Sequence, residues 1–168
     1  MTTTERPLAL VTGASSGIGY AMAAMSTRGT GKILFTSSVA ALTPGPFEAV
    51  YAASKAFLHS FAEALRNELK DSGVTVTSLL PRPTDTEFFE RAGKEDTRVG
   101  SGKKDDPAEV ARQGFDALMK GDDKVVAGSF VNKVQGVAGR ITPDTAKAAM
   151  HRRMAEPGKG GTSPAGDE

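Results

Sequence analysis

Two side chains in the middle of the chain have the types and spacing needed to move a proton together. Tyr51 and Lys55 are four residues apart, so on a helix both lie on one face, one turn from each other. An ammonium group held near a phenol favours the phenolate. A tyrosine in that setting can take a proton from an alcohol or give one to a carbonyl oxygen. The alternative is an ordinary helix pair, so the surrounding sequence has to decide.

A hydroxyl group precedes this pair at the end of an apolar run. Residues 32–36 (KILFT) predict a buried strand, and Ser38 lies just past its C-terminal end. A hydroxyl at that place could hydrogen-bond the same substrate oxygen as Tyr51. The three residues together therefore predict a site for an alcohol or a carbonyl compound.

A glycine-rich turn near the N-terminus could hold a phosphate group. Residues 7–11 form a short apolar run, and Gly13, Gly17 and Gly19 follow with the spacing G-x-x-x-G-x-G before a helix begins. Such a turn lets backbone N–H groups approach a pyrophosphate, and the helix N-terminus adds positive potential. Glycines that merely permit a positive φ in a tight turn are the alternative.

The glycine spacing opened by Thr12, together with Ser38…Tyr51-x-x-x-Lys55, resembles the short-chain dehydrogenase/reductase family. The resemblance implies that Ser38 and Tyr51 hold the substrate oxygen and that Lys55 assists Tyr51. Residues 81–88 (PRPTDTEF) resemble the segment with which the family contacts the nicotinamide amide. The implied cofactor is NAD or NADP, with no preference between them, and its implied contacts are Thr12, Gly13, Ser15, Ser16, Gly17, Ile18, Gly19, Tyr51, Lys55, Thr84 and Thr86.

The resemblance implies an NAD(P)-dependent oxidoreductase that interconverts an alcohol and a carbonyl by hydride transfer, with Tyr51 as general acid/base. Its partner would be a small-molecule substrate. The alternatives are no function, or a catalytically impaired remnant that pairs with full-length relatives through a helix over residues 47–70. The same helix could form a homo-oligomer.

Two departures from the family pattern bear on activity. About twenty residues after the glycines, the family has further strands and a residue that reads the ribose 2′ position, but this chain passes directly to the serine strand. The family's catalytic asparagine is missing with them, as after an internal deletion. In addition, Arg82 occupies the place of a family glycine, where it could strain the backbone or crowd the cofactor.

The pattern of apolar runs predicts an α/β fold, a truncated Rossmann-like, doubly wound parallel sheet. About four strands are expected, over residues 7–12, 32–38, 74–80 and 124–128. With the middle missing, the first two strands either pair directly through a right-handed crossover or leave an open slot. Residues 1–155 are expected to form a single incomplete domain, with a disordered tail over residues 156–168.

Further segments predict a lid and additional helices. The charged residues 90–106 predict a solvated loop at the place where the family has a mobile substrate lid. Asp106 and Pro107 predict the start of a helix that ends at Gly121. A stripe from Phe130 to Ile141 and a helix from residue 143 to Met154 are expected to follow.

Composition excludes several classes of protein. A net charge of +1 gives no reason to expect nucleic acid as a partner, and the absence of cysteine excludes a disulfide framework or a thiolate metal site. Of the two histidines, His59 is expected to be an ordinary surface or packing residue, and no metal is expected. No apolar run approaches the ~18 residues of a membrane helix, so no membrane association and a cytoplasmic location are expected.

Overall fold

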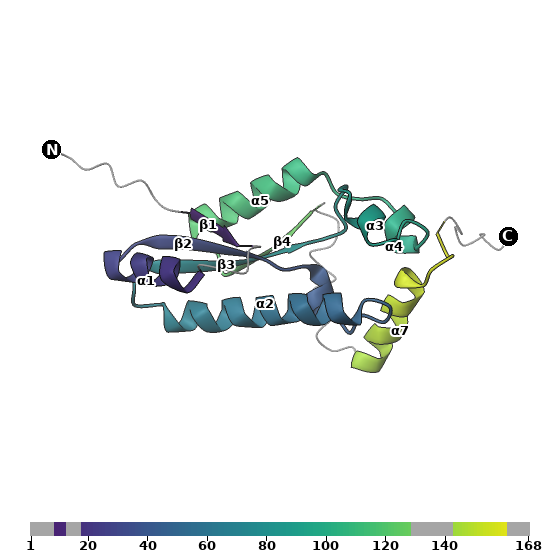
Figure 1. Ribbon diagram of the computed structural model, residues 1–168, viewed down its shortest axis with the longest axis horizontal. Helices are drawn as coiled ribbons and strands as arrows, with labels where there is room; N and C mark the ends of the chain where they lie inside the picture. Colours follow the sequence, from purple (N-terminus) through teal and green to yellow (C-terminus); the bar gives the residue numbers. More distant parts are fainter. Residues whose placement is uncertain (1–8, 13–17, 129–142, 161–168) are drawn as a thin grey trace.

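The computed structural model describes residues 9–12, 18–128 and 143–160 of the 168-residue chain (Figure 1). Strands and helices alternate along most of it. In chain order the elements are β1 (Ala9–Thr12), α1 (Ile18–Arg28), β2 (Gly31–Thr36), the 3-10 helix η1 (Val39–Leu42), α2 (Ala49–Glu68), β3 (Val74–Pro81), α3 (Phe88–Arg91), α4 (Arg98–Ser101), α5 (Pro107–Lys120), β4 (Lys124–Ala127) and α7 (Asp144–Ala155).

The four described strands form one parallel sheet in the order β1-β2-β3-β4. Each lies where the sequence predicted a strand, with ends that differ from the predicted ones by at most two residues. β1 pairs directly with β2, with Leu10 opposite Ile33. Direct pairing is therefore the arrangement adopted, and α1 is the crossover helix. The predicted α/β class with a truncated, Rossmann-like parallel sheet is confirmed.

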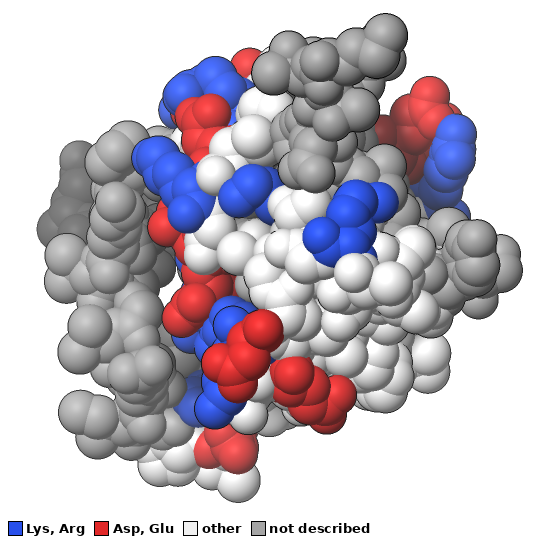
Figure 2. Space-filling view, turned by 90° about the vertical axis from the view of Figure 1, so that its left-hand side faces the viewer, with Lys and Arg blue, Asp and Glu red and all other residues white. Residues whose placement is uncertain are grey.

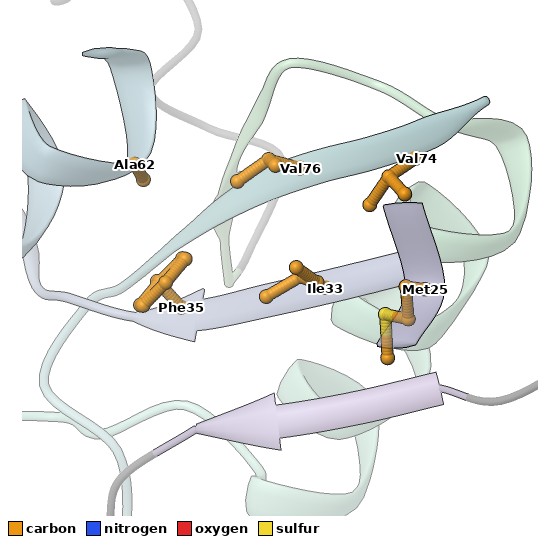
Figure 3. Close-up of a cluster of buried hydrophobic side chains, with 6 residues drawn as sticks. All are labelled: Met25, Ile33, Phe35, Ala62, Val74 and Val76. Atoms are coloured by element: carbon orange, nitrogen blue, oxygen red, sulfur yellow. The ribbon is translucent and has the colours of Figure 1, made fainter. Parts of the chain in front are cut away.

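Helices cover both faces of the sheet (Figure 1). Side chains alternate along β2, so that Ile33 and Phe35 face α1 and α2, whereas Leu34 faces α5. The α2 side holds a buried cluster (Figure 3) of Met25, Ile33, Phe35, Ala62, Val74 and Val76. The α5 side holds a second cluster of Leu34, Leu79, Val110, Leu118 and Ala127. Burial on both faces makes β2 and β3 the centre of the fold.

Helix α1 lies on the same side of the sheet as α2. Its Met25 side chain is fully buried, in the same cluster as Phe35 and Ala62. A Cβ on Gly31 would lie 2.6 Å from the Met25 sulfur, so a larger residue there would displace Met25. Helix α1 thus packs tightly against the start of β2.

The predicted ends of α5 are confirmed, because local side-chain chemistry sets them. Asp106 caps the helix by accepting the Ala108 N–H at 3.2 Å, and Pro107 is the first helical residue. Gly121 ends the helix in the left-handed region, with φ 78°. α7 closely matches the helix predicted to end at Met154. The predicted stripe over residues 130–141 falls outside the described residues.

The face shown in Figure 2 carries acidic and basic side chains side by side, and neither sign forms a continuous patch on it. None of the helices in the described ranges is long and apolar enough to cross a bilayer. Part of the expected tail is described and lies against the rest of the chain: the Gly158 N–H donates to the Asp96 carboxylate at 2.9 Å. Residues 161–168 lie outside the description, so the domain boundary near residue 155 stays a prediction.

Candidate active site

The predicted site residues that the structure describes gather at one edge of the sheet. β1, β2 and β3 are parallel and end at Thr12, Thr36 and Pro81. The segments that follow β2 and β3 therefore begin at the same edge, where ligands bind in open parallel sheets. Ile18 and Gly19 begin α1. Residues 13–17, which include Gly13, Ser15, Ser16 and Gly17, lie outside the described residues.

Ser38 is buried two residues past the end of β2. The strand ends earlier than predicted, at Thr36, but the Ser37 N–H still donates to the Leu79 carbonyl at 2.7 Å. Ser38 then turns the chain into η1, and its Oγ accepts the Ala40 N–H at 3.2 Å. A hydroxyl carries one donor and two acceptor positions. Ser38 in this role still has a proton to donate to a substrate oxygen.

Lys55 is fixed against the end of β2 at both its backbone and its side chain. Its carbonyl accepts the Ser37 hydroxyl at 2.7 Å, and its Nζ donates to the Thr36 carbonyl at 3.2 Å. Burial lowers the pKa of Lys55, because the charged form loses solvation. An ammonium has three donor protons, so the bond to Thr36 leaves two for a ligand.

Tyr51 lies in the first turn of α2, between Lys55 and α3. The Lys55 Nζ is 5.7 Å from the centre of the Tyr51 ring. On α3, the Phe88 ring is 5.2 Å from the Tyr51 ring, with the two planes tilted by 43°. The tyrosine is half-buried as a result. The ring that would move the proton is held between a cation and an aromatic side chain.

The loop after β3 places Thr84 and Thr86 at the same edge, and both hydroxyls bond to nearby backbone. The Thr84 hydroxyl donates to the Arg82 carbonyl at 2.8 Å. Thr86 accepts the Phe88 N–H at 3.4 Å, at the start of α3. The loop pairs with the segment before α5, where the Asp85 N–H donates to the Asp105 carbonyl at 2.9 Å.

Arg82 is accommodated without backbone strain. Among the described residues other than glycine, only Phe47 has a positive φ, so the strain considered for Arg82 is not present. Its N–H donates to the Ala127 carbonyl at 3.2 Å, and its Nε lies 3.8 Å from the Asp105 carboxylate. Crowding of a ligand by the guanidinium is the remaining way in which Arg82 could affect the site.

Comparison with known proteins relates the sequence and the fold to one family. The sequence model of the short chain dehydrogenases matches residues 21–97. The chain is 41% identical, over 71 residues, to the uncharacterized oxidoreductase YbbO of Escherichia coli. It also matches a short-chain dehydrogenase from Burkholderia cenocepacia, solved with NADP, with a TM-score of 0.59 and 29% identity. The expected relationship to the short-chain dehydrogenase/reductase family is confirmed.

The match covers part of each of these proteins. It spans 42% of this chain and 26% of YbbO, and 81% of this chain but 52% of the Burkholderia protein. A short-chain dehydrogenase from Sphingobium yanoikuyae, solved with NADPH, has the same fold, with a TM-score of 0.58 over 82% of this chain and 64% of its own. The chain is thus truncated relative to these proteins, and NAD or NADP is the cofactor class of its family.

The described residues fit the nicotinamide end of such a cofactor. At the carboxyl edge of the sheet the Lys55 ammonium makes one hydrogen bond within the described residues, to Thr36, and its other protons suit a ribose hydroxyl. Gly19 lies at the start of α1, and among the described residues no atom outside its chain neighbours and the backbone of its own helix lies within 4 Å of the position that a Cβ would take. Both observations concern the nicotinamide and pyrophosphate portions of the cofactor.

Sequence reasoning missed the contacts of this site that join elements far apart in the chain. Phe88 beside Tyr51 was not singled out, although its place shortly after Thr86 could have indicated it. A second missed group is Glu48, whose carboxylate lies 2.6 Å from the Lys94 ammonium and 3.1 Å from the His151 ring. No local pattern signals that group, because its members are far apart in the chain.

Proposed function

We propose that this chain is an NAD(P)-dependent oxidoreductase that interconverts an alcohol and a carbonyl, with Tyr51 as the general acid/base. The observation that supports it most is the placement of Lys55. Its Nζ is anchored on the Thr36 carbonyl at 3.2 Å and lies 5.7 Å from the Tyr51 ring. Ser38 is buried at the same edge of the sheet. Ser38, Tyr51 and Lys55 are the residues proposed to act.

Each residue would have a separate task. In reduction, Tyr51 gives its phenolic proton to the carbonyl oxygen, and in oxidation it takes the alcohol proton. Ser38 donates a hydrogen bond to the same oxygen and so orients the substrate. Lys55 stabilises the phenolate by its positive charge. A bound nicotinamide would supply or accept the hydride.

Cofactor affinity is the weak point of this proposal. The sequence retains the glycine run and the residues expected at the nicotinamide, but it lacks the segment that holds adenine and ribose in the family. Two or three lost charge-assisted hydrogen bonds, at ~1.5–3 kcal/mol each, would weaken binding by roughly two or more orders of magnitude. We expect dissociation constants near ~1 mM for NADH and NADPH alike, with little preference between them.

Calorimetric titration of both reduced coenzymes tests this directly, with circular dichroism to establish folding. Turnover of a panel of small ketones and aldehydes at saturating coenzyme would follow. Millimolar binding with measurable turnover is the expected result. A folded chain that binds neither coenzyme would contradict the proposed function.

A second function, as a partner of full-length relatives or of a second copy, is supported by one face of α2. Val50 is 85% exposed and Phe57 is 65% exposed, and their spacing of seven places them on one side of the helix. Exposed apolar side chains aligned in this way are typical of interaction surfaces. Light scattering after gel filtration should give the mass of a complex for the unchanged chain, alone or mixed with a full-length relative. For Phe57→Glu it should give the mass of a monomer. Phe115→Glu on α5, where Phe115 is 57% exposed, is the matched control, and a monomer in every case would contradict pairing.

A further inference from the structure

Glu48 is a buried carboxylate with two partners from distant parts of the chain. Its side chain is 8% exposed. One oxygen accepts a hydrogen bond from the Lys94 Nζ at 2.6 Å, and the other lies 3.1 Å from the His151 Nε2. Lys94 lies between α3 and α4, and His151 belongs to α7. Their side chains are 19% and 12% exposed, so all three groups are largely withdrawn from water.

The residue before Glu48 has an unusual backbone that the same two elements support. Phe47 has φ 65°, a region that a bulky residue rarely adopts. Its carbonyl accepts a hydrogen bond from the Lys94 Nζ at 3.2 Å, and the Arg152 guanidinium lies 5.2 Å from the centre of its ring. A backbone of this kind persists where its surroundings hold it. Here Lys94 and α7 supply that support.

The α3–α4 segment, residues 88–101, and α7 also contact each other. α4 packs against α7. Beyond α7, the Gly158 N–H donates to the Asp96 carboxylate, and the Gly160 N–H donates to the Asp96 carbonyl. Both elements lie at one end of the molecule, beyond the start of α2 (Figure 1). The α3–α4 segment and α7 therefore form one unit, and Glu48 joins that unit to the rest of the chain.

This unit also bears on Tyr51. Glu48 is the residue immediately before α2, and Tyr51 lies in the first turn of that helix. Phe88, the first residue of the α3–α4 segment, contacts the Tyr51 ring. We propose that Glu48 is a positioning residue, which latches the α3–α4 segment and α7 to the start of α2 and so keeps Phe88 against Tyr51. The consequence for catalysis rests on the proposed function, whereas the latch itself does not.

Hydrogen exchange followed by mass spectrometry tests the latch in the full chain. Glu48→Gln removes the charge with little change in shape. Exchange over residues 88–101 and 144–155 should then rise together by about tenfold or more, while β3 amides stay protected. Glu63→Gln is the matched control. Glu63 is likewise paired with a cation, the Arg66 guanidinium at 2.9 Å, but both residues lie on α2 and the Glu63 side chain is 37% exposed. That control should leave both regions unchanged.

Lys94→Met and His151→Phe extend the test in case Glu48→Gln does not fold. Each removes one partner, and each should raise exchange in the same two regions. In a Tyr20→Phe background the near-ultraviolet circular dichroism reports Tyr51, the remaining tyrosine, and its signal should fall in each latch variant. Unchanged exchange, or a rise that includes β3 equally, would overturn the latch. Raised exchange in a chain that binds no coenzyme would uphold the latch and contradict the proposed function alone.

Discussion

Two parts of the sheet, the central strands β2 and β3 and the strand β1, differ in how many neighbouring elements support them. The central strands β2 and β3 each pair with a strand along both edges and are covered on both faces. Strand β1 has four residues and, among the described residues, pairs with β2 alone. Ser38, Tyr51 and Lys55 lie beside β2 and β3, whereas the glycine run follows β1 in the sequence.

This difference affects the proposed proton transfer and the proposed cofactor binding unequally. A proton-transferring group needs to be held to within about an ångström, which a doubly covered sheet provides. Binding of a dinucleotide draws energy from groups far from the reacting ring, and those groups would extend beyond β1. Under the proposed function, we therefore expect the site to position its reacting groups well but to bind the coenzyme weakly. Four measurements would test that difference, and they follow in order of expected size.

Removing the Tyr51 hydroxyl should have the largest effect. Tyr51→Phe keeps the ring that contacts Phe88 but loses the titrating oxygen. Turnover should fall by roughly 10²–10⁴-fold, the usual contribution of a general acid/base, while coenzyme affinity stays the same. Steady-state kinetics with coenzyme titration measure both. Tyr20→Phe serves as the control, and unchanged turnover in Tyr51→Phe would remove Tyr51 from the mechanism.

The central position of β2 predicts a large loss of stability on truncation of its core. The Phe35 side chain is 1% exposed and meets the Phe61 ring edge-on at 5.6 Å. Phe35→Ala should lower the free energy of unfolding by about 3–5 kcal/mol, measured by urea denaturation. Phe57→Ala removes an exposed ring of the same type and should change it by less than about 1 kcal/mol. Equal losses in the free energy of unfolding of the two variants would show that the buried core around β2 is not what stabilises the fold.

Shortening Arg82 should show whether its guanidinium weakens coenzyme binding. Because Arg82 has no positive φ, its effect on binding would come from the guanidinium and not from the backbone. Arg82→Ala and Arg82→Gly should therefore both improve coenzyme affinity, by about fivefold for a gain of ~1 kcal/mol. Calorimetry measures the change. A gain with glycine alone would point to backbone freedom, and no gain would show that the arginine is tolerated.

The smallest effect concerns pH and the contact between α2 and β3. The His59 Nδ1 lies 2.9 Å from the buried Ser78 hydroxyl, and burial lowers the pKa of His59 from 6.5. The unfolded chain therefore binds this proton more readily than the folded chain. Stability should be complete above the unfolded value of 6.5 and should decline as pH falls through the lowered folded value. Melting temperatures across this range should fall by a few degrees, and His59→Gln should flatten the slope.

Much of the site could be predicted because its residues are close in the sequence. The i, i+4 spacing of Tyr51 and Lys55 needs only a helix to place them on one face. Ser38 follows a strand, and parallel strands bring their carboxyl ends to one edge. The Phe88 ring and the Glu48 group could not be predicted in this way. His151 and Glu48 are 103 residues apart, and no periodic pattern connects them.

By itself, the sequence determined where strands and helices form, because apolar periodicity, caps and glycines act over a few residues. Asp106 and Gly121 bound α5 on that basis. Only the tertiary structure decided which face α1 covers, since Met25 could have served either side and is placed by packing against Phe35 and Ala62. It also decided that Lys94 and His151 meet at Glu48. Contacts of that kind depend on how whole elements pack, and packing is a property of the complete fold.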